Sequence, residues 1–110
     1  MSKYNYSMRC SQDYDLVLDV LSDQVDAYTP QSTTEVITAK VAEGMVKRMQ
    51  VRSIGETRKL CLTDYEAMIL FYLVNPSLGA YNEYTRAILT PLLHDIHKSV
   101  ILTQSKLLQS

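Results

Sequence analysis

Apolar and polar side chains alternate over the first ten residues. The apolar positions are Tyr4, Tyr6, Met8 and Cys10, and the polar ones between them are Lys3, Asn5, Ser7 and Arg9. A period of two is typical of a β-strand with one buried face. The sequence therefore predicts one strand over residues 3–10.

The period then changes to that of a helix. From Gln12 to Tyr28, apolar residues recur at spacings of three and four, as on one face of a helix. Thr29-Pro30 ends this segment, because the residue before a proline is pushed out of the α region. Ser32-Thr33-Thr34-Glu35 has the spacing of a capping box and opens a second helix, for which Gly55 is the expected stop.

The second half of the chain also reads as helical. Residues 56–61 are expected to form a connector. Thr63-Asp64-Tyr65-Glu66 is a second capping box, and it starts an apolar helix over residues 67–74 that Asn75-Pro76 ends. The apolar residues of this helix lie on all its faces, which predicts deep burial or a subunit interface.

Residues 75–79 are expected to form a loop, followed by a last helical region over residues 80–108. Pro91 interrupts that region, so a kink or a restart is expected there. One seam of this region has heptad spacing with a single polar position, as in a short coiled coil. The seam consists of Leu89, Leu93, Ile96, Val100, Thr103 and Leu107.

The composition is that of a globular protein. The 110 residues are 46% hydrophobic and 21% charged, which fits one ordinary domain or two very small ones that share a core. No apolar run is long enough for a membrane span, and no secretory signal is recognisable at the N-terminus. Cys10 and Cys61 show no disulfide or metal-binding spacing, so a cytoplasmic location is expected.

Charge is distributed unevenly along the chain, although the net charge is only −1. Residues 1–30 are acidic, and positive charge is densest between residues 47 and 59. The basic residues there are Lys47, Arg48, Arg52, Arg58 and Lys59, against Glu56 alone. Such a run forms either a solvated helix face or a surface that contacts phosphates.

One short strand followed by two helices and a tight polar turn is the element order of a ribbon-helix-helix unit. There, strands from two chains pair into a ribbon that enters the DNA major groove. In that arrangement the apolar side of the strand faces the dimer core. Asn5, Ser7 and Arg9 are then predicted to contact bases, and Lys3, Ser32, Thr33 and Thr34 to contact phosphates. A plain helical bundle, with residues 3–10 as a tail or an edge strand, is the alternative.

Residues 5–49 resemble the ribbon-helix-helix superfamily, and the whole chain resembles the TraM family of conjugative-plasmid relaxosome accessory proteins. Three stretches carry the resemblance: residues 6–15, Val41-Ala42-Glu43-Gly44-Met45-Val46, and residues 62–70. The resemblance implies binding to repeated sites near an origin of transfer and repression of the protein's own promoter. It also implies a tetramer formed by C-terminal helices, and it implies two protein partners, the tail of a coupling ATPase and a relaxase.

The resulting prediction is a mainly α protein with one N-terminal β-strand, without catalytic activity, cofactor or bound metal. A ribbon-helix-helix domain over residues 1–54 is followed by a linker, residues 55–61, and a helical tetramerisation domain over residues 62–110. Duplex DNA and further copies of the chain are the predicted partners. The predicted oligomerisation residues are Tyr6, Met8, Leu70, Leu89, Leu93, Ile96, Val100 and Leu107.

Other functions stay open at this stage. A simple repressor or an antitoxin of the same fold would also bind DNA. A helical protein–protein interaction module, such as a phage or plasmid assembly factor or inhibitor, would not. His94 and His97 lie three residues apart on a predicted helix, but no third ligand is nearby in the sequence, so an exposed pair is expected instead of a metal site. If this pair borders an oligomer seam, it would make assembly sensitive to pH.

Overall fold

A computed structural model describes residues 3–103 of the chain. The protein is mainly helical with a short strand at its N-terminus, as predicted. In chain order the elements are β1 (Lys3–Ser7), α1 (Ser11–Ala27), α2 (Thr33–Ile54), β2 (Lys59–Thr63), α3 (Asp64–Val74), a 3₁₀ helix (Asn75–Ala80), α4 (Glu83–Ile96) and a π-helical turn (His97–Ile101). None of these helices is long and apolar enough to cross a membrane.

The helix boundaries follow from local capping. α1 ends just before Thr29-Pro30, and α2 ends at Gly55, both as predicted. The Ser32 hydroxyl accepts a hydrogen bond from the Glu35 backbone N–H at 3.2 Å, which satisfies one of the free donors at the start of α2. α3 begins with the complete capping box that Thr63 and Glu66 predict.

The two strands form a single antiparallel pair within the chain. Tyr4 lies opposite Leu62, Asn5 opposite Cys61 and Tyr6 opposite Leu60. This corrects the prediction that residues 56–61 form a connector. Leu60 and Leu62 are buried while Lys59 is exposed, which is the alternation of a strand with one covered face.

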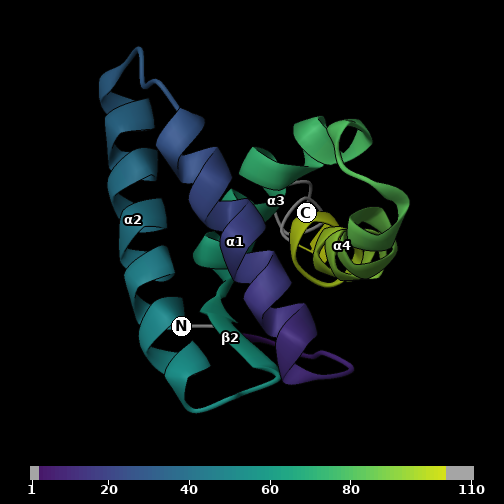
Figure 1. The fold of residues 1–110 in the computed structure, drawn as a ribbon. Coiled ribbons are helices and arrows are strands. Elements are labelled where there is room, and N and C mark those ends of the chain that lie inside the picture. Colours follow the sequence, from purple (N-terminus) through teal and green to yellow (C-terminus); the bar gives the residue numbers. More distant parts are fainter. Residues whose placement is uncertain (1–2, 104–110) are drawn as a thin grey trace.

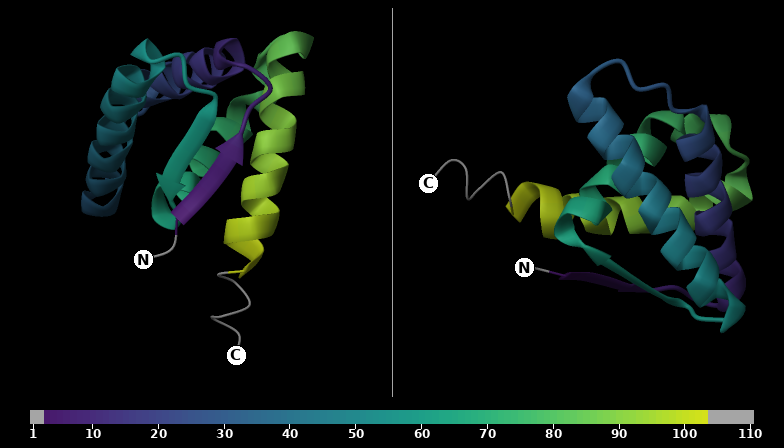
Figure 2. Two further views of the ribbon diagram at one scale, coloured as in Figure 1. Left: turned by 90° about the horizontal axis from the view of Figure 1, so that it is seen from below. Right: turned by 90° about the vertical axis from the view of Figure 1, so that its left-hand side faces the viewer.

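The helices pack on the inner side of this sheet. α1 and α2 pack side by side as an antiparallel pair, with their connecting turn at the top of Figure 1 and the sheet at the opposite end. α3 packs against both of these helices. Seen from the sheet side, β2 and β1 lie next to each other between α2 and α4 (Figure 2, left).

One hydrophobic core joins all these elements. It extends from Tyr4 on β1 to Val100 in the π-helical turn, and its most buried members come from both halves of the chain. They include Tyr14, Leu21, Met45, Leu60, Leu70, Leu89 and Ile96. The two predicted domains, residues 1–54 and 62–110, both contribute to this core, because β1 pairs with β2 and α1 packs against α3 and α4.

Most of the predicted oligomerisation residues belong to the same core. Six of them are buried within the single chain, so their side chains are already covered by its own elements. These are Met8, Leu70, Leu89, Leu93, Ile96 and Val100. An apolar heptad seam cannot by itself distinguish packing within a chain from packing between chains. Tyr6 is half-buried, and Leu107 lies outside the described residues.

The last helical region starts at Glu83, where the Asn82 side chain caps α4 by accepting from the Thr85 N–H at 2.8 Å. The predicted loop of residues 75–79 is a 3₁₀ helix instead. Pro91 lies inside α4, which continues without a restart to Ile96. Pro91 is exposed, and so is Ala87, whose carbonyl loses its helical partner, so the missing hydrogen bond falls on the solvent side.

Candidate nucleic-acid interface

The outward side of the sheet is polar along both strands. On β1 it presents Lys3, Asn5 and Ser7, which are exposed, while Tyr4 faces the core. The register places Thr63, Cys61 and Lys59 of β2 directly opposite them. We call these six residues the ribbon face. No helix passes across this side of the sheet in Figure 2, left.

Basic residues border the ribbon face. Arg48 and Arg52 of α2 line one hollow of about 260 Å³ together with Lys3 and Thr63. At the other end of the sheet, the Arg58 carbonyl accepts a hydrogen bond from the Met8 N–H at 2.8 Å, which continues the strand pairing beyond Ser7. Three basic residues of the segment 47–59 therefore lie near the two ends of the N-terminal strand, Arg48 and Arg52 beside Lys3 and Arg58 beside Met8.

Sequence reasoning found the basic segment and the strand separately and missed their contact. Residues 8–46 separate them, and no local pattern reports a contact over that distance. One signal was present: Leu60 and Leu62 alternate with Lys59, Cys61 and Thr63. That alternation predicts a second strand.

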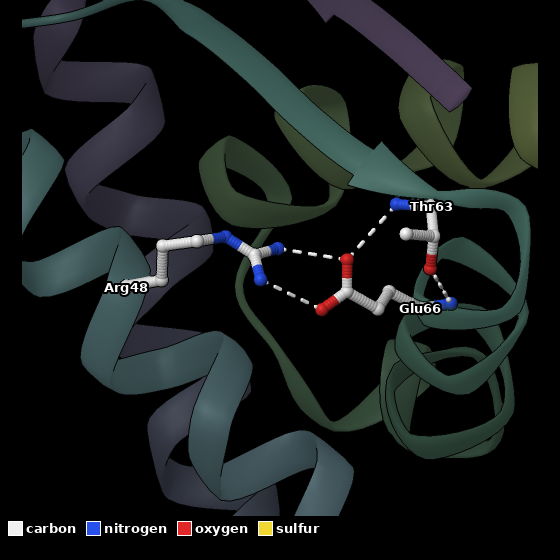
Figure 3. A network of polar contacts seen from close by, with 3 residues as sticks. All are labelled: Arg48, Thr63 and Glu66. Carbon is white, nitrogen blue, oxygen red and sulfur yellow. Dashed lines mark hydrogen bonds and ion pairs between the residues drawn. The ribbon is translucent and has the colours of Figure 1, made fainter. Parts of the chain in front are cut away.

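A network of polar contacts joins α2 to the start of α3 (Figure 3). The Arg48 guanidinium donates to both carboxylate oxygens of Glu66, from Nη1 to Oε2 at 2.9 Å and from Nη2 to Oε1 at 2.8 Å. The Thr63 backbone N–H donates to the same Oε1 at 2.9 Å, and the Glu66 N–H donates to the Thr63 hydroxyl at 3.1 Å. This network fixes the Arg48 side chain beside the ribbon face.

Burial alone would raise the pKa of the Glu66 carboxyl. The hydrogen bonds from Arg48 and Thr63 and the positive charge of Arg48 outweigh that effect and hold the pKa below its ordinary value. Glu66 therefore stays ionised and keeps its hydrogen bonds to Arg48.

Arg9 lies just beyond the end of β1 and is exposed. Its guanidinium pairs with Asp13 one helical turn further on, with Nε 3.4 Å from Oδ2 and Nη2 3.4 Å from Oδ1. Arg9 therefore lies at the end of the ribbon face, and a base contact from it requires this pair to open.

The other predicted phosphate contacts are not part of this surface. Ser32, Thr33 and Thr34 are exposed at the N-terminus of α2, at the far end of α1 from the sheet (Figure 1). The 17 residues of α1 correspond to a length of about 26 Å at the usual rise per residue. The structure therefore brings Lys3, Asn5 and Ser7 together and leaves these three residues apart from them.

Both histidines are exposed, His94 on α4 and His97 in the π-helical turn. His97 stacks on Phe71 with ring centroids 5.7 Å apart, and His94 lies one turn before it. Among residues 3–103, no group of three or more histidine, cysteine, aspartate or glutamate side chains is arranged to hold a metal ion.

Comparisons with known proteins add no relative. Neither the protein-family models, nor the curated proteins, nor the solved structures include a match to this chain.

Proposed function

We propose that the protein binds duplex DNA through the ribbon face, without catalysing a reaction. The observation that carries this proposal is the two-stranded sheet with one open polar side bordered by arginine and lysine. The major groove of B-DNA is wide enough to admit a two-stranded β-ribbon, and each base pair presents a distinct hydrogen-bonding pattern there. Basic residues around such a ribbon can contact the phosphates on either side.

The proposal assigns base contacts to the middle of β1. Asn5 can bind adenine through two hydrogen bonds, and Ser7 can donate or accept at either base of a pair. Lys3, Lys59 and Arg52 are assigned to phosphates, since they lie at the margins of the ribbon. Arg9 contacts a base only if DNA displaces Asp13 from its guanidinium.

This ribbon differs from that of a ribbon-helix-helix dimer, in which β1 strands of two copies would pair. β1 already pairs with β2 along one edge. α4 runs along its other side (Figure 2, left), where the Tyr4 hydroxyl donates to Asp95 Oδ2 at 2.5 Å. We therefore propose a ribbon formed within one chain, which needs no second copy in order to exist.

The role in conjugation that the TraM resemblance implies depends on this proposal. A relaxosome accessory protein with autorepressor activity would use the same ribbon face on sites near a transfer origin. Tetramer formation and docking to a coupling ATPase are further proposals, and each needs surfaces other than the buried seam of α4.

A fluorescence-anisotropy titration of random duplex DNA at two salt concentrations tests the proposal, with molar mass measured in parallel. We expect binding at low salt that weakens steeply at high salt, because phosphate contacts release counterions. Lys59→Gln is expected to weaken binding, whereas Lys98→Gln, at an exposed lysine in the π-helical turn, is the matched control. Absence of binding at low salt would overturn the proposal.

A second candidate function is supported by the outer side of α2. Val36, Ile37, Val51 and Ile54 are exposed there, the last two at 69% and 84%. Exposed apolar residues on one helix are typical of a protein–protein contact. A helical interaction module would retain partner binding after Asn5→Ala and Ser7→Ala and would lose it after Val51→Asp.

A further inference from the structure

The hollow between α2 and the ribbon face has an unbalanced set of charges. Three cationic side chains line it, Lys3, Arg48 and Arg52, and Glu66 is its one carboxylate. We propose that this hollow is a binding site for a phosphate group. The proposal rests on the proposed function in one respect, because the backbone of DNA is the expected source of that phosphate.

Glu66 does not neutralise the hollow. Its carboxylate is committed to Arg48 and to the Thr63 N–H, so one of three positive charges is balanced and two remain. Among residues 3–103, neither Lys3 nor Arg52 takes part in an ion pair. A phosphodiester of the DNA backbone carries one negative charge, so the hollow can hold it with positive charge to spare. Inorganic phosphate, with a charge between −1 and −2 near neutral pH, can serve as its probe.

Donors remain available on Arg48 as well. A guanidinium carries five N–H donors in a planar fork, and the bidentate contact with Glu66 uses two of them. Its planar contact with Glu66 holds the group in one orientation, so the remaining donors do not have to be ordered when a ligand binds. Glu66 is therefore a positioning residue for this site.

The start of α3 lies at the same place, and its peptide dipoles favour an anion there, although Asp64 and Glu66 stand in its first turn. Thr63 is the N-cap of this helix and lines the hollow with Arg48 and Arg52. The N-terminus of a helix favours anions because its first N–H groups point outward and the peptide dipoles add up. Cations from β1 and α2 and this helix terminus thus converge from three elements.

The size of the hollow fits a small oxyanion. A water molecule occupies about 30 Å³ in the liquid. The hollow of about 260 Å³ therefore has room for a tetrahedral anion with part of its hydration shell. A phosphate that accepts from donors on different elements is bound more specifically than a carboxylate, which offers two oxygens in one plane.

A titration with inorganic phosphate, followed by backbone amide NMR, tests the site without DNA. The expected result is a set of shifts concentrated at Cys61, Leu62, Thr63 and Arg52. Arg52→Gln should abolish these shifts, and Lys98→Gln should leave them unchanged. Arg52 is exposed, so its replacement is not expected to unfold the protein. Shifts spread evenly over all basic residues, or unchanged in Arg52→Gln, would overturn the site.

Titrating the same variants with duplex DNA tests whether the DNA backbone supplies the phosphate. Loss of one phosphate contact lowers the slope of log affinity against log salt by about 0.9 for B-DNA. We expect that decrease for Arg52→Gln and for Lys3→Gln, and none for Lys98→Gln. If the protein shows these NMR shifts with inorganic phosphate but does not bind DNA, the proposed function is rejected and the phosphate site stands. DNA binding with equal slopes for all three variants would reject the site together with the phosphate contacts assigned to Lys3 and Arg52. It would keep DNA binding by the rest of the ribbon face.

Discussion

Glu66 is the residue on which the polar contacts between α2 and α3 depend. Its carboxylate accepts from Arg48 on one side and closes the capping box of α3 on the other. The residue is only 9% exposed. Because these bonds favour the ionised form, they lower the pKa of the folded carboxyl relative to the ordinary value of 4.5.

Stability at acid pH should report this shift. A group whose pKa is lowered by folding stabilises the protein above its ordinary pKa, and this contribution disappears as the pH falls through the lowered value. Unfolding in urea between pH 6 and pH 2.5 should show a decline below about pH 4.5 that is smaller in Glu66→Gln. Glu56→Gln, in an exposed turn, should keep the full decline; equal profiles for both variants would contradict the assignment.

The Tyr4 hydroxyl joins β1 to α4 through its hydrogen bond to Asp95. Burial, together with the hydrogen bond to Asp95 and the charge of that carboxylate, raises the pKa of the Tyr4 phenol well above its ordinary range, so it remains a donor. Tyr4→Phe should lower the free energy of unfolding by about 1.5–3 kcal/mol, the usual cost of losing a hydrogen bond to a charged acceptor. Tyr65→Phe, at an exposed tyrosine, should change it by less than about 0.5 kcal/mol in the same urea titration.

At the scale of elements, the sequence predicted those helices and strands whose signals lie in residues close together along the chain. The alternation of residues 3–10 and the caps at Ser32 and Thr63 are local patterns. The structure confirms both caps and confirms the strand over Lys3–Ser7, three residues shorter than predicted. β2 was missed because a five-residue strand after a basic run resembles a connector. The ribbon face could be predicted only on β1, and its other half required the pairing of distant segments.

Leu60 shows how much the missed strand contributes to the fold. Its side chain is 0% exposed between the sheet and the helices. Leu60→Ala should destabilise the protein by about 2–5 kcal/mol, through lost transfer energy and the cavity left behind. Val51→Ala on the exposed side of α2 is the control, with an expected change below about 0.5 kcal/mol. A small effect of Leu60→Ala would show that β2 is not part of the stable core.

At the scale of the molecule, the shared core makes the two halves dependent on each other. A fragment of residues 1–54 lacks the strand that pairs with β1, and a fragment of residues 62–110 lacks α1 and most of β2. We expect each fragment to be largely unfolded by circular dichroism and the full chain to unfold in one transition. A folded fragment of residues 62–110 would instead support the separate domain that the sequence predicted.

The pairing of β1 with β2 has a consequence for the order in which the protein is made. Residues 3–7 leave the ribosome before their partner strand, residues 59–63, which is synthesised about fifty residues later. Until then β1 has a free edge that can pair with the strand of another nascent chain, which is the route to domain-swapped dimers. The ribbon face is therefore completed only after β2 has been synthesised, and a chain truncated before β2 has none.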